Sequence, residues 1–188
     1  MSRTPLNAED WIKGGFRALT AGGPLAIRVE AIARDMKVSK GSFYWHFENV
    51  PAFCDQMMAF WEKNATQDVI ALQDQLPSPV LKLRALSKIA TQPYKDYGGI
   101  GSEPAIRAWA KGDAKVAAAV RRVDSARLAH LNEIFDDLKL TNPDLPRLFY
   151  ASLIGLQEIA DRDDSESLRQ LTVGRQMLPS DAGADDGD

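Results

Sequence analysis

The sequence predicts an all-α protein of about nine helices. Apolar residues recur at spacings of three and four along most of the 188 residues, and no run of alternating apolar and polar residues indicates a β-sheet. Clusters of proline and glycine interrupt this pattern where helices are expected to end. We therefore expect a helical N-terminal domain over residues 1–48, a larger helical domain over residues 49–178 and a disordered acidic tail over residues 179–188.

The first helix is expected to begin after Asn7, whose side chain suits an N-cap, and to end at Gly22-Gly23-Pro24. Gly14 and Gly15 lie inside it, and each costs about 1 kcal/mol relative to alanine in a helix. We expect another helix to approach closely at these two positions, where only glycine leaves enough room.

Two short helices and a turn are predicted next. The apolar residues of 29–36 follow the i, i+3, i+4, i+7 pattern of a helix that faces a core. Residues 37–39 are short and polar enough for a turn, and a third helix is predicted from Lys40 to Phe47 with Ser39 as its cap.

A fourth helix is predicted from Pro51 to about Gln75, because proline is favoured in the first turn and Pro77 and Pro79 follow the last. Later helices are predicted near residues 80–96, 103–111, 114–138, 144–161 and 165–178, with loops at 97–102, 141–143 and 161–165.

Composition indicates an ordinary globular protein in a reducing cytoplasm. The only cysteine, Cys54, has no partner for an internal disulfide, and neither a signal core nor a membrane span is evident. Net charge is −3, but residues 1–50 carry seven Lys and Arg residues against five acidic ones. Charge alone does not point to DNA, although the local field at the docking face matters more than the total.

Residues 27–47 carry the most specific pattern in the chain. Ile32-Ala33, Val38-Ser39, Gly41, Phe43-Tyr44 and His46-Phe47 occupy nine positions of one spaced motif. This motif resembles the helix-turn-helix signature of the TetR family of bacterial transcriptional regulators. The resemblance implies a DNA-binding regulator whose C-terminal helices form a dimerisation and ligand-sensing domain.

The spacing within this motif separates an anchoring face from a reading face. Phe43 and Phe47 lie one helical turn apart and should fix the third helix on the first two. We expect Lys40 and Ser42 to donate to base edges and Trp45 to contact thymine methyl groups. Tyr44 and His46 should instead bind phosphates. The predicted DNA-binding residues are Arg28, Ser39, Lys40, Gly41, Ser42, Tyr44, Trp45 and His46. The alternative is a plain aromatic core segment, but five adjacent aromatic residues cannot all face one core from a helix.

Two departures from the family pattern affect the predicted phosphate contacts. Arg28 and Val29 stand where family members often have threonine pairs, and Val50 stands where they often have a phosphate-binding lysine. The resemblance therefore implies one missing backbone contact at Val50.

Residues 103–135 resemble a pattern common in one group of TetR-like regulators. We expect the helices at 144–161 and 165–178 to pair with their copies in a four-helix homodimer interface; the alternative is that they pack within one subunit. A dimer would read a palindromic operator in double-stranded DNA, and a small-molecule effector of unknown identity would release it. Activation instead of repression stays open.

An effector pocket is the least specific of these expectations. Its candidate lining residues are Met57, Met58, Trp61, Tyr94, Tyr97, Arg107 and Trp109. The alternatives are that the Met and aromatic residues are ordinary core and that Arg107 lies in a solvated ion pair.

Other functions find less support in the sequence. His46 and His130 are the only histidines, too few for the common zinc or histidine-based catalytic sites, and His130 is expected simply on a helix face. Residues 98–101 lack the ending of a phosphate loop, and residues 161–164 lack the spacing of a calcium loop. We expect no enzyme, metal or cofactor. A DNA-binding adaptor or architectural protein of the same fold, without an effector, is the alternative function.

Overall fold

The computed structural model describes residues 6–91 and 101–162. Across these residues it contains eight α-helices and no β-strand, which confirms the all-α prediction. The α-helices are α1 (Ala8–Gly22), α2 (Val29–Asp35), α3 (Val50–Glu62), α4 (Asp68–Gln73), α5 (Pro79–Thr91), α6 (Ser102–Ala110), α7 (Ala114–Asp137) and α8 (Leu145–Arg162). Short 3₁₀ helices lie at η1 (Pro24–Ala26) and η2 (Lys40–Trp45), and a π-helix, η3 (Lys63–Gln67), joins α3 to α4. None of the helices described is long and apolar enough to cross a membrane.

Helix α1 begins as the sequence predicts. The Asn7 side chain accepts a hydrogen bond from the Asp10 N–H, and the Asp10 side chain accepts one from the Asn7 N–H, so both residues form a capping box. A Cβ at Gly14 would lie 2.8 Å from Ile32 Cγ2, and one at Gly15 would lie 2.6 Å from Met57 Sδ. The close approach expected at the two glycines is confirmed, to α2 for one and to α3 for the other.

The turn after α2 is a Schellman motif. The Val38 N–H donates to the Ala33 carbonyl and the Lys37 N–H to the Arg34 carbonyl, while Lys37 adopts a left-handed φ of 57°. This turn orients the next segment toward the end of the molecule.

The third predicted helix is shorter and tighter than expected. It is a 3₁₀ helix that ends at Trp45, and the Ser39 side chain makes no capping hydrogen bond. Instead, the Ser39 carbonyl accepts from both the Ser42 N–H and the Ser42 hydroxyl. A serine side chain that competes for a backbone carbonyl in this way favours a local turn over an α-helix.

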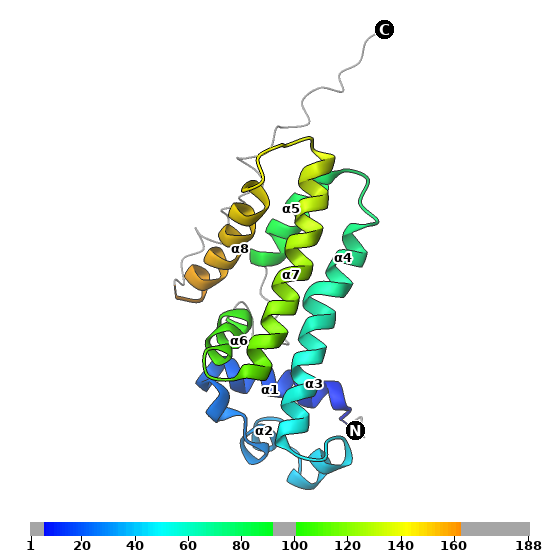
Figure 1. The fold of residues 1–188 in the computed structure, drawn as a ribbon. Helices are drawn as coiled ribbons and strands as arrows, with labels where there is room; N and C mark the ends of the chain where they lie inside the picture. The colour runs from blue at the N-terminus through cyan, green and yellow to red at the C-terminus, as the bar shows by residue number, and fades with distance from the viewer. Residues whose placement is uncertain (1–5, 92–100, 163–188) are drawn as a thin grey trace.

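One long helical rod and helix α7 connect the two ends of the molecule (Figure 1). The rod is α3–η3–α4, and it corresponds to the single helix predicted from Pro51 to Gln75 except that it widens at η3. Within η3 the Asp68 N–H donates to the Lys63 carbonyl, five residues back.

Two apolar cores hold these elements together. The first joins α1, α2 and η2 to α3, α6 and the start of α7, and the second joins α5 and the end of α7 to α8. The first core therefore includes residues on both sides of position 48. Helices α5 to α8 match the predicted helices closely, but α8 continues to Arg162, into the predicted loop at 161–165. The predicted helix at 165–178 and tail at 179–188 lie outside the described residues.

Candidate functional site

Phe43 anchors the segment η2 to the rest of the protein. Its side chain is fully buried, and its ring lies 5.3 Å, centroid to centroid, from both Trp11 on α1 and Phe53 on α3. Phe47 is 2% exposed and lies 4.8 Å from the Phe53 ring. The two phenylalanines are buried as predicted, but their ring contacts with other helices are to α1 and to α3, the predicted fourth helix, rather than to both of the first two helices.

The side chains between Phe43 and Phe47 point outward at the tip of the molecule. Trp45 is 87% exposed and Tyr44 is 53% exposed, although both adjoin the buried Phe43. In Figure 1, η2 lies at the end that also carries α2, away from α5 and α8. A segment with exposed aromatic and polar side chains on a rigid, aromatic-anchored base is suited to insertion into a DNA groove.

Lys40 is paired with an acid on the neighbouring helix. Its Nζ lies 2.5 Å from Oε1 of Glu30, with both side chains exposed. The hydrogen bond and charge of Glu30 raise the pKa of Lys40, and the hydrogen bond from Lys40 is the main reason that the pKa of Glu30 is lowered. Lys40 must leave Glu30 to reach a base edge.

The remaining predicted DNA-binding side chains are also at the surface. The Arg28 Nε donates to the Leu25 carbonyl at 3.0 Å, and the His46 Nε2 lies 3.1 Å from the Leu6 carbonyl oxygen. Ser39 and Gly41 are exposed, and Ser42 is half-buried. The structure therefore places all eight predicted residues on or beside η2 and the start of α2.

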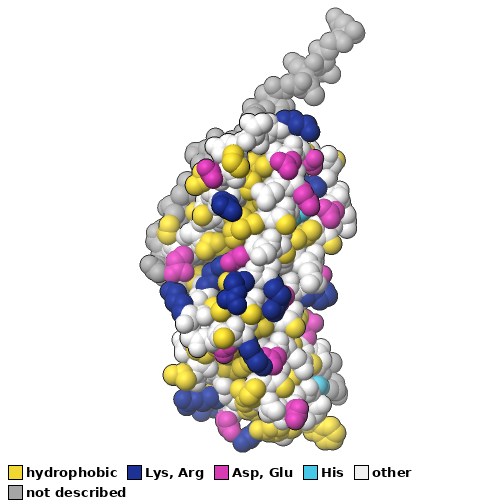
Figure 2. Space-filling model, in the orientation of Figure 1, with side chains coloured by type: hydrophobic (Ala, Val, Ile, Leu, Met, Phe, Trp, Pro, Cys, Tyr) yellow, Lys and Arg dark blue, Asp and Glu magenta, His cyan; other side chains and the backbone are white. Residues whose placement is uncertain are grey.

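Positive charge is not concentrated at this tip. On the face in Figure 2, Lys and Arg side chains form a band across the middle of the molecule, and hydrophobic side chains protrude at the end that carries η2. Leu25, which is 81% exposed, joins Tyr44 and Trp45 among these exposed hydrophobic residues. Residues 1–50 carry only a small excess of basic residues, and the surface at η2 is correspondingly rich in exposed hydrophobic side chains.

The predicted effector-pocket residues that the structure describes do not all line one cavity. Met57, Met58 and Trp61 belong to the first core at 0–6% exposure, as the core alternative expected. Met58 and Trp109 line an open groove between α3 and α7. Tyr94 and Tyr97 lie outside the described residues.

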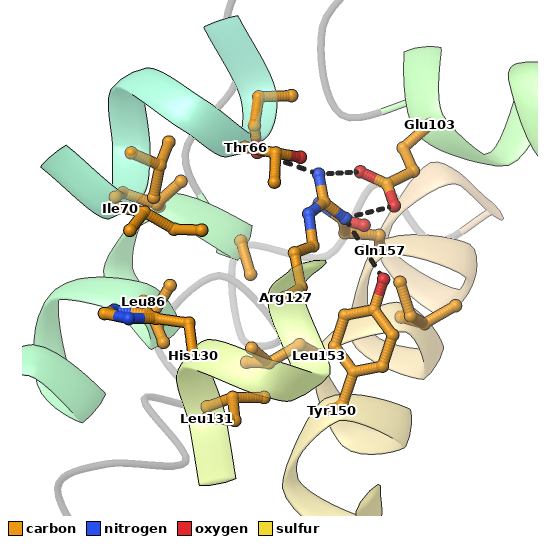
Figure 3. Close-up of a pocket in the computed structure, with 15 residues that line it drawn as sticks. Thr66, Ile70, Leu86, Glu103, Arg127, His130, Leu131, Tyr150, Leu153 and Gln157 are labelled. Atoms are coloured by element: carbon orange, nitrogen blue, oxygen red, sulfur yellow. Dashed lines mark hydrogen bonds and ion pairs between the residues drawn. The ribbon is translucent and has the colours of Figure 1, made fainter. Parts of the chain in front are cut away.

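A different cavity lies in the other half of the molecule. It has a volume of about 70 Å³ and lies between the η3–α4 segment, α5, α7 and α8 (Figure 3). Its walls are mainly apolar. None of the predicted effector-pocket residues that the structure describes lines it. The apolar lining includes Val69, Ile70, Leu86, Leu131 and Leu153.

A buried ion pair closes one end of this cavity. Arg127 donates from Nη1 to Glu103 Oε1 at 2.7 Å and from Nη2 to Glu103 Oε2 at 3.1 Å. Its Nη2 also donates to the Ala65 carbonyl of η3 at 3.0 Å. Burial alone would raise the pKa of Glu103, but Arg127 and then Arg107 hold it below its ordinary value.

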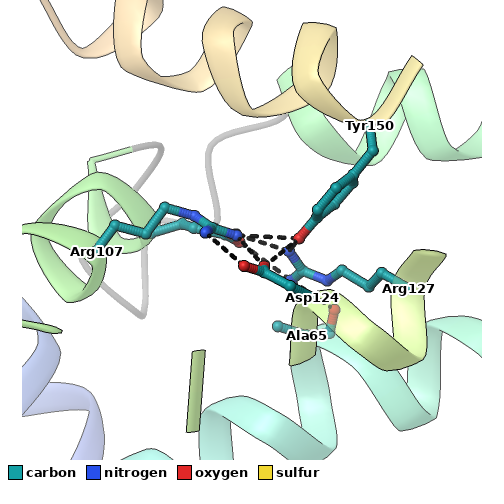
Figure 4. Close-up of polar contacts among 6 residues, drawn as sticks. Ala65, Arg107, Asp124, Arg127 and Tyr150 are labelled. Atoms are coloured by element: carbon teal, nitrogen blue, oxygen red, sulfur yellow. Dashed lines mark hydrogen bonds and ion pairs between the residues drawn. The ribbon is translucent and has the colours of Figure 1, made fainter. Parts of the chain in front are cut away.

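Arg107 belongs to the same polar cluster (Figure 4). Its Nη2 donates to Glu103 Oε1 at 2.8 Å and to Asp124 Oδ1 at 2.6 Å, and Tyr150 donates its hydroxyl hydrogen to Asp124. Burial is the main cause that raises the pKa of Tyr150 to about 12. Arg107 is therefore in an ion pair, as the alternative expected, but the pair is partly buried and links α6 to α7.

Sequence reasoning missed the polar residues of this region. His130 is buried, not merely on a helix face: it is 6% exposed, and its Nε2 lies 2.8 Å from Gln73 Oε1. Arg127, His130, Leu131 and Ile134 follow the same i, i+3, i+4, i+7 pattern as a core-facing stripe. That pattern would have indicated burial of both polar members.

Among residues 6–91 and 101–162, no group of three or more His, Cys, Asp or Glu side chains is placed to hold a metal ion.

Comparison with known families agrees with the geometry at the tip. Residues 12–49 match the family model described as bacterial regulatory proteins of the tetR family. The matched segment runs from the first turns of α1 to the N-cap of α3 and includes all eight predicted DNA-binding residues. No curated protein matches the chain. The family match, the buried Phe43 anchor and the exposed segment beside it show that residues 12–49 are similar to the helix-turn-helix DNA-binding domain of the tetR family of bacterial regulatory proteins.

Proposed function

We propose that the protein is a repressor that binds a palindromic operator as a homodimer and leaves it when a small-molecule effector binds. The observation that carries the DNA-binding part is the contrast between fully buried Phe43 and its neighbour Trp45 at 87% exposure. A recognition segment needs this contrast, because its base must be rigid while its tip contacts the groove.

We assign different roles to the exposed side chains. Lys40 and Ser42 donate to base edges, and Trp45 contacts thymine methyl groups, so these three determine sequence preference. Tyr44, His46 and Arg28 hold phosphates, with support from the exposed backbone of Ser39 and Gly41, and these contacts position the segment without reading sequence.

Dimerisation is assigned to α8 and the sequence that follows it. Leu148 is 63% exposed and Ile159 is 50% exposed, while a Cβ at Gly155 would meet nothing within 4 Å. An apolar helix face with a small residue at its centre suits close packing against a second copy. Two recognition segments related by a twofold axis would then read half-sites about 34–36 Å apart.

The effector is assigned to the cavity beside η3. The rod α3–η3–α4 contacts the recognition segment through Phe53 at one end and lines the cavity at the other. A ligand that binds more tightly to one position of this rod stabilises the dimer in that position. In that state the two recognition segments no longer match the spacing of the operator half-sites.

The proposed function is tested by selecting bound sites from random double-stranded DNA with the full-length protein. The expected result is a palindromic consensus found at few promoters. Lys40→Ala and Ser42→Ala should change the consensus, whereas Tyr44→Phe and His46→Ala should weaken binding to all sequences alike.

Three results would count against parts of the proposal. Many dispersed sites without a palindrome would favour an architectural or adaptor role. Equal losses on operator and random DNA for all four variants would contradict the division of roles. A monomer at micromolar concentration, measured by size-exclusion chromatography with light scattering, would contradict the homodimer.

A further inference from the structure

The cavity beside η3 contains a buried polar atom without a partner. The hydroxyl of Thr66 has no hydrogen-bond partner within the described part of the chain, and Thr66 is 3% exposed and lines the cavity. A buried hydroxyl without a partner destabilises the folded protein, because its hydrogen bonds to water are lost and no others replace them. A ligand with a hydrogen-bonding group would remove that cost.

The backbone that presents Thr66 is also unusual. Thr66 lies in the π-helix η3, and single π-turns inside α-helices occur frequently at functional sites. Side-chain donors support the widened turn: Asn64 Nδ2 donates to the Phe60 carbonyl at 2.9 Å, and Arg127 Nη2 donates to the Ala65 carbonyl. These two hydrogen bonds hold the backbone just before Thr66.

The charged groups at the cavity are already neutralised. Arg127 and Arg107 are balanced by Glu103 and Asp124, and each of these four makes at least one hydrogen bond of 2.8 Å or less within the cluster. A charged ligand would have to break one of these pairs or remain buried without a counter-ion, and both are expensive. His130 does not supply a free partner, because its Nε2 lies beside Gln73 Oε1.

The size of the cavity limits the ligand further. An engineered apolar cavity of about 150 Å³ holds benzene, so the 70 Å³ found here has room for a smaller molecule. Leu131 and Leu153 lie across the cavity from Thr66, together with His130 and Tyr150, and the leucines suit a short hydrocarbon portion (Figure 3).

We infer that the cavity takes a small, uncharged, largely apolar molecule, of the size of a three-carbon alcohol or ketone, whose polar group hydrogen-bonds to the Thr66 hydroxyl. A hydroxyl can donate and accept, so alcohols and ketones both fit. The bound molecule would act as the effector, and this part of the inference rests on the proposed function.

The test is a titration of the full-length protein, followed by amide chemical shifts, with 1-propanol, acetone, propylamine and propionate. The four probes share nearly the same hydrocarbon chain and differ in charge. We expect the alcohol and ketone to bind with a Kd in the millimolar range, as befits about four non-hydrogen atoms, and at least about tenfold more tightly than either charged probe. Equal or tighter binding of a charged probe, or no binding of any probe, would overturn the inference.

Variants of two threonines make the test specific. Thr66→Val removes the hydroxyl at nearly constant volume and should weaken 1-propanol binding about five- to tenfold, while Thr66→Ser should retain it. Thr20→Val is the matched control, because the Thr20 hydroxyl is also buried without a partner but lines a different groove beside α6. An equal effect of the Thr66→Val and Thr20→Val variants would contradict the assignment to Thr66.

DNA retention measured on the same samples separates this inference from the proposed function. If DNA binding is found but no probe binds, the ligand inference fails and the DNA-binding function stands. If 1-propanol binds through Thr66 but does not change DNA retention, the ligand inference stands and effector release fails.

Discussion

The Nζ of Lys40 lies 2.5 Å from Oε1 of Glu30, so a side chain predicted to read DNA is paired with an acid in the free protein. Glu30 also places a negative charge beside the surface that must approach phosphates. Under the proposed function, Lys40 leaves Glu30 when it binds DNA, and Glu30 then lies close to the backbone of the duplex.

Glu30→Gln should strengthen DNA binding on the order of two- to fivefold at low salt, because it removes one repulsive charge and releases Lys40. The measurement is a DNA titration at several salt concentrations, in which the gain should shrink as salt screens it. Asp68→Asn is the matched control, since Asp68 forms a similar exposed pair with Lys63 away from η2. An equal gain in the control would mean that net charge, not the Lys40 pair, is responsible.

Gly15→Ala should destabilise the protein by about 1–3 kcal/mol, which is typical of overpacking. An added Cβ would lie 2.6 Å from Met57 Sδ and 2.7 Å from Phe53 Cζ, so α1 and α3 would have to move apart. Urea unfolding measures the effect. Gly112→Ala is the control, because its nearest neighbour would be a backbone oxygen at 4.0 Å; a loss as large as that of Gly15→Ala would argue against the close approach.

The helix boundaries and the glycine contacts could be predicted because they depend on local signals. Asn7 caps α1 through its own side chain, and Gly14 and Gly15 stand out because glycine is costly inside a helix. The anchoring of Phe43 was predictable in the same way, from its spacing to Phe47 and the number of adjacent aromatic residues.

The cavity was not predictable, because it depends on contacts between distant segments. Arg127 pairs with Glu103 across 24 residues, and Thr66, which lines the cavity, lies in the π-helix η3. A sequence pattern gives no sign of a widened turn. The aromatic and methionine residues chosen for the pocket, such as Met57, instead fill the core between α1 and α3.

Cys54 should be slow to react with alkylating reagents. Burial, followed by the charges of Asp55 and Asp113, raises the pKa of the Cys54 thiol from 9.0 to about 11. Only the thiolate reacts, so at pH 8 iodoacetamide should modify the folded protein about a hundredfold more slowly than the protein in urea. The folded rate should also rise about tenfold per pH unit up to pH 10. A plateau near pH 9 in the folded protein would show that its pKa is not raised.

Glu103→Gln should be the most destabilising of these changes, at about 3–5 kcal/mol, because it leaves Arg127 and Arg107 as buried charges with an incomplete partner. The measurement is urea unfolding at pH 7. Glu133→Gln is the control on the neighbouring helix α7, where the side chain is 78% exposed, and it should change stability by less than about 0.5 kcal/mol.

Lowering the pH should reveal the same contribution. Since the pKa of Glu103 is held below its ordinary value of 4.5 in the folded protein, its stabilising effect is complete above that value and is lost as the pH falls below it. The wild-type protein should therefore lose stability as the pH falls below about 4.5. The Glu103→Gln variant should lose less over the same interval, with the remainder due to groups such as Asp124, whose pKa is also lowered. Parallel pH profiles for the two proteins would mean that Glu103 is not held in its charged form by the two arginines.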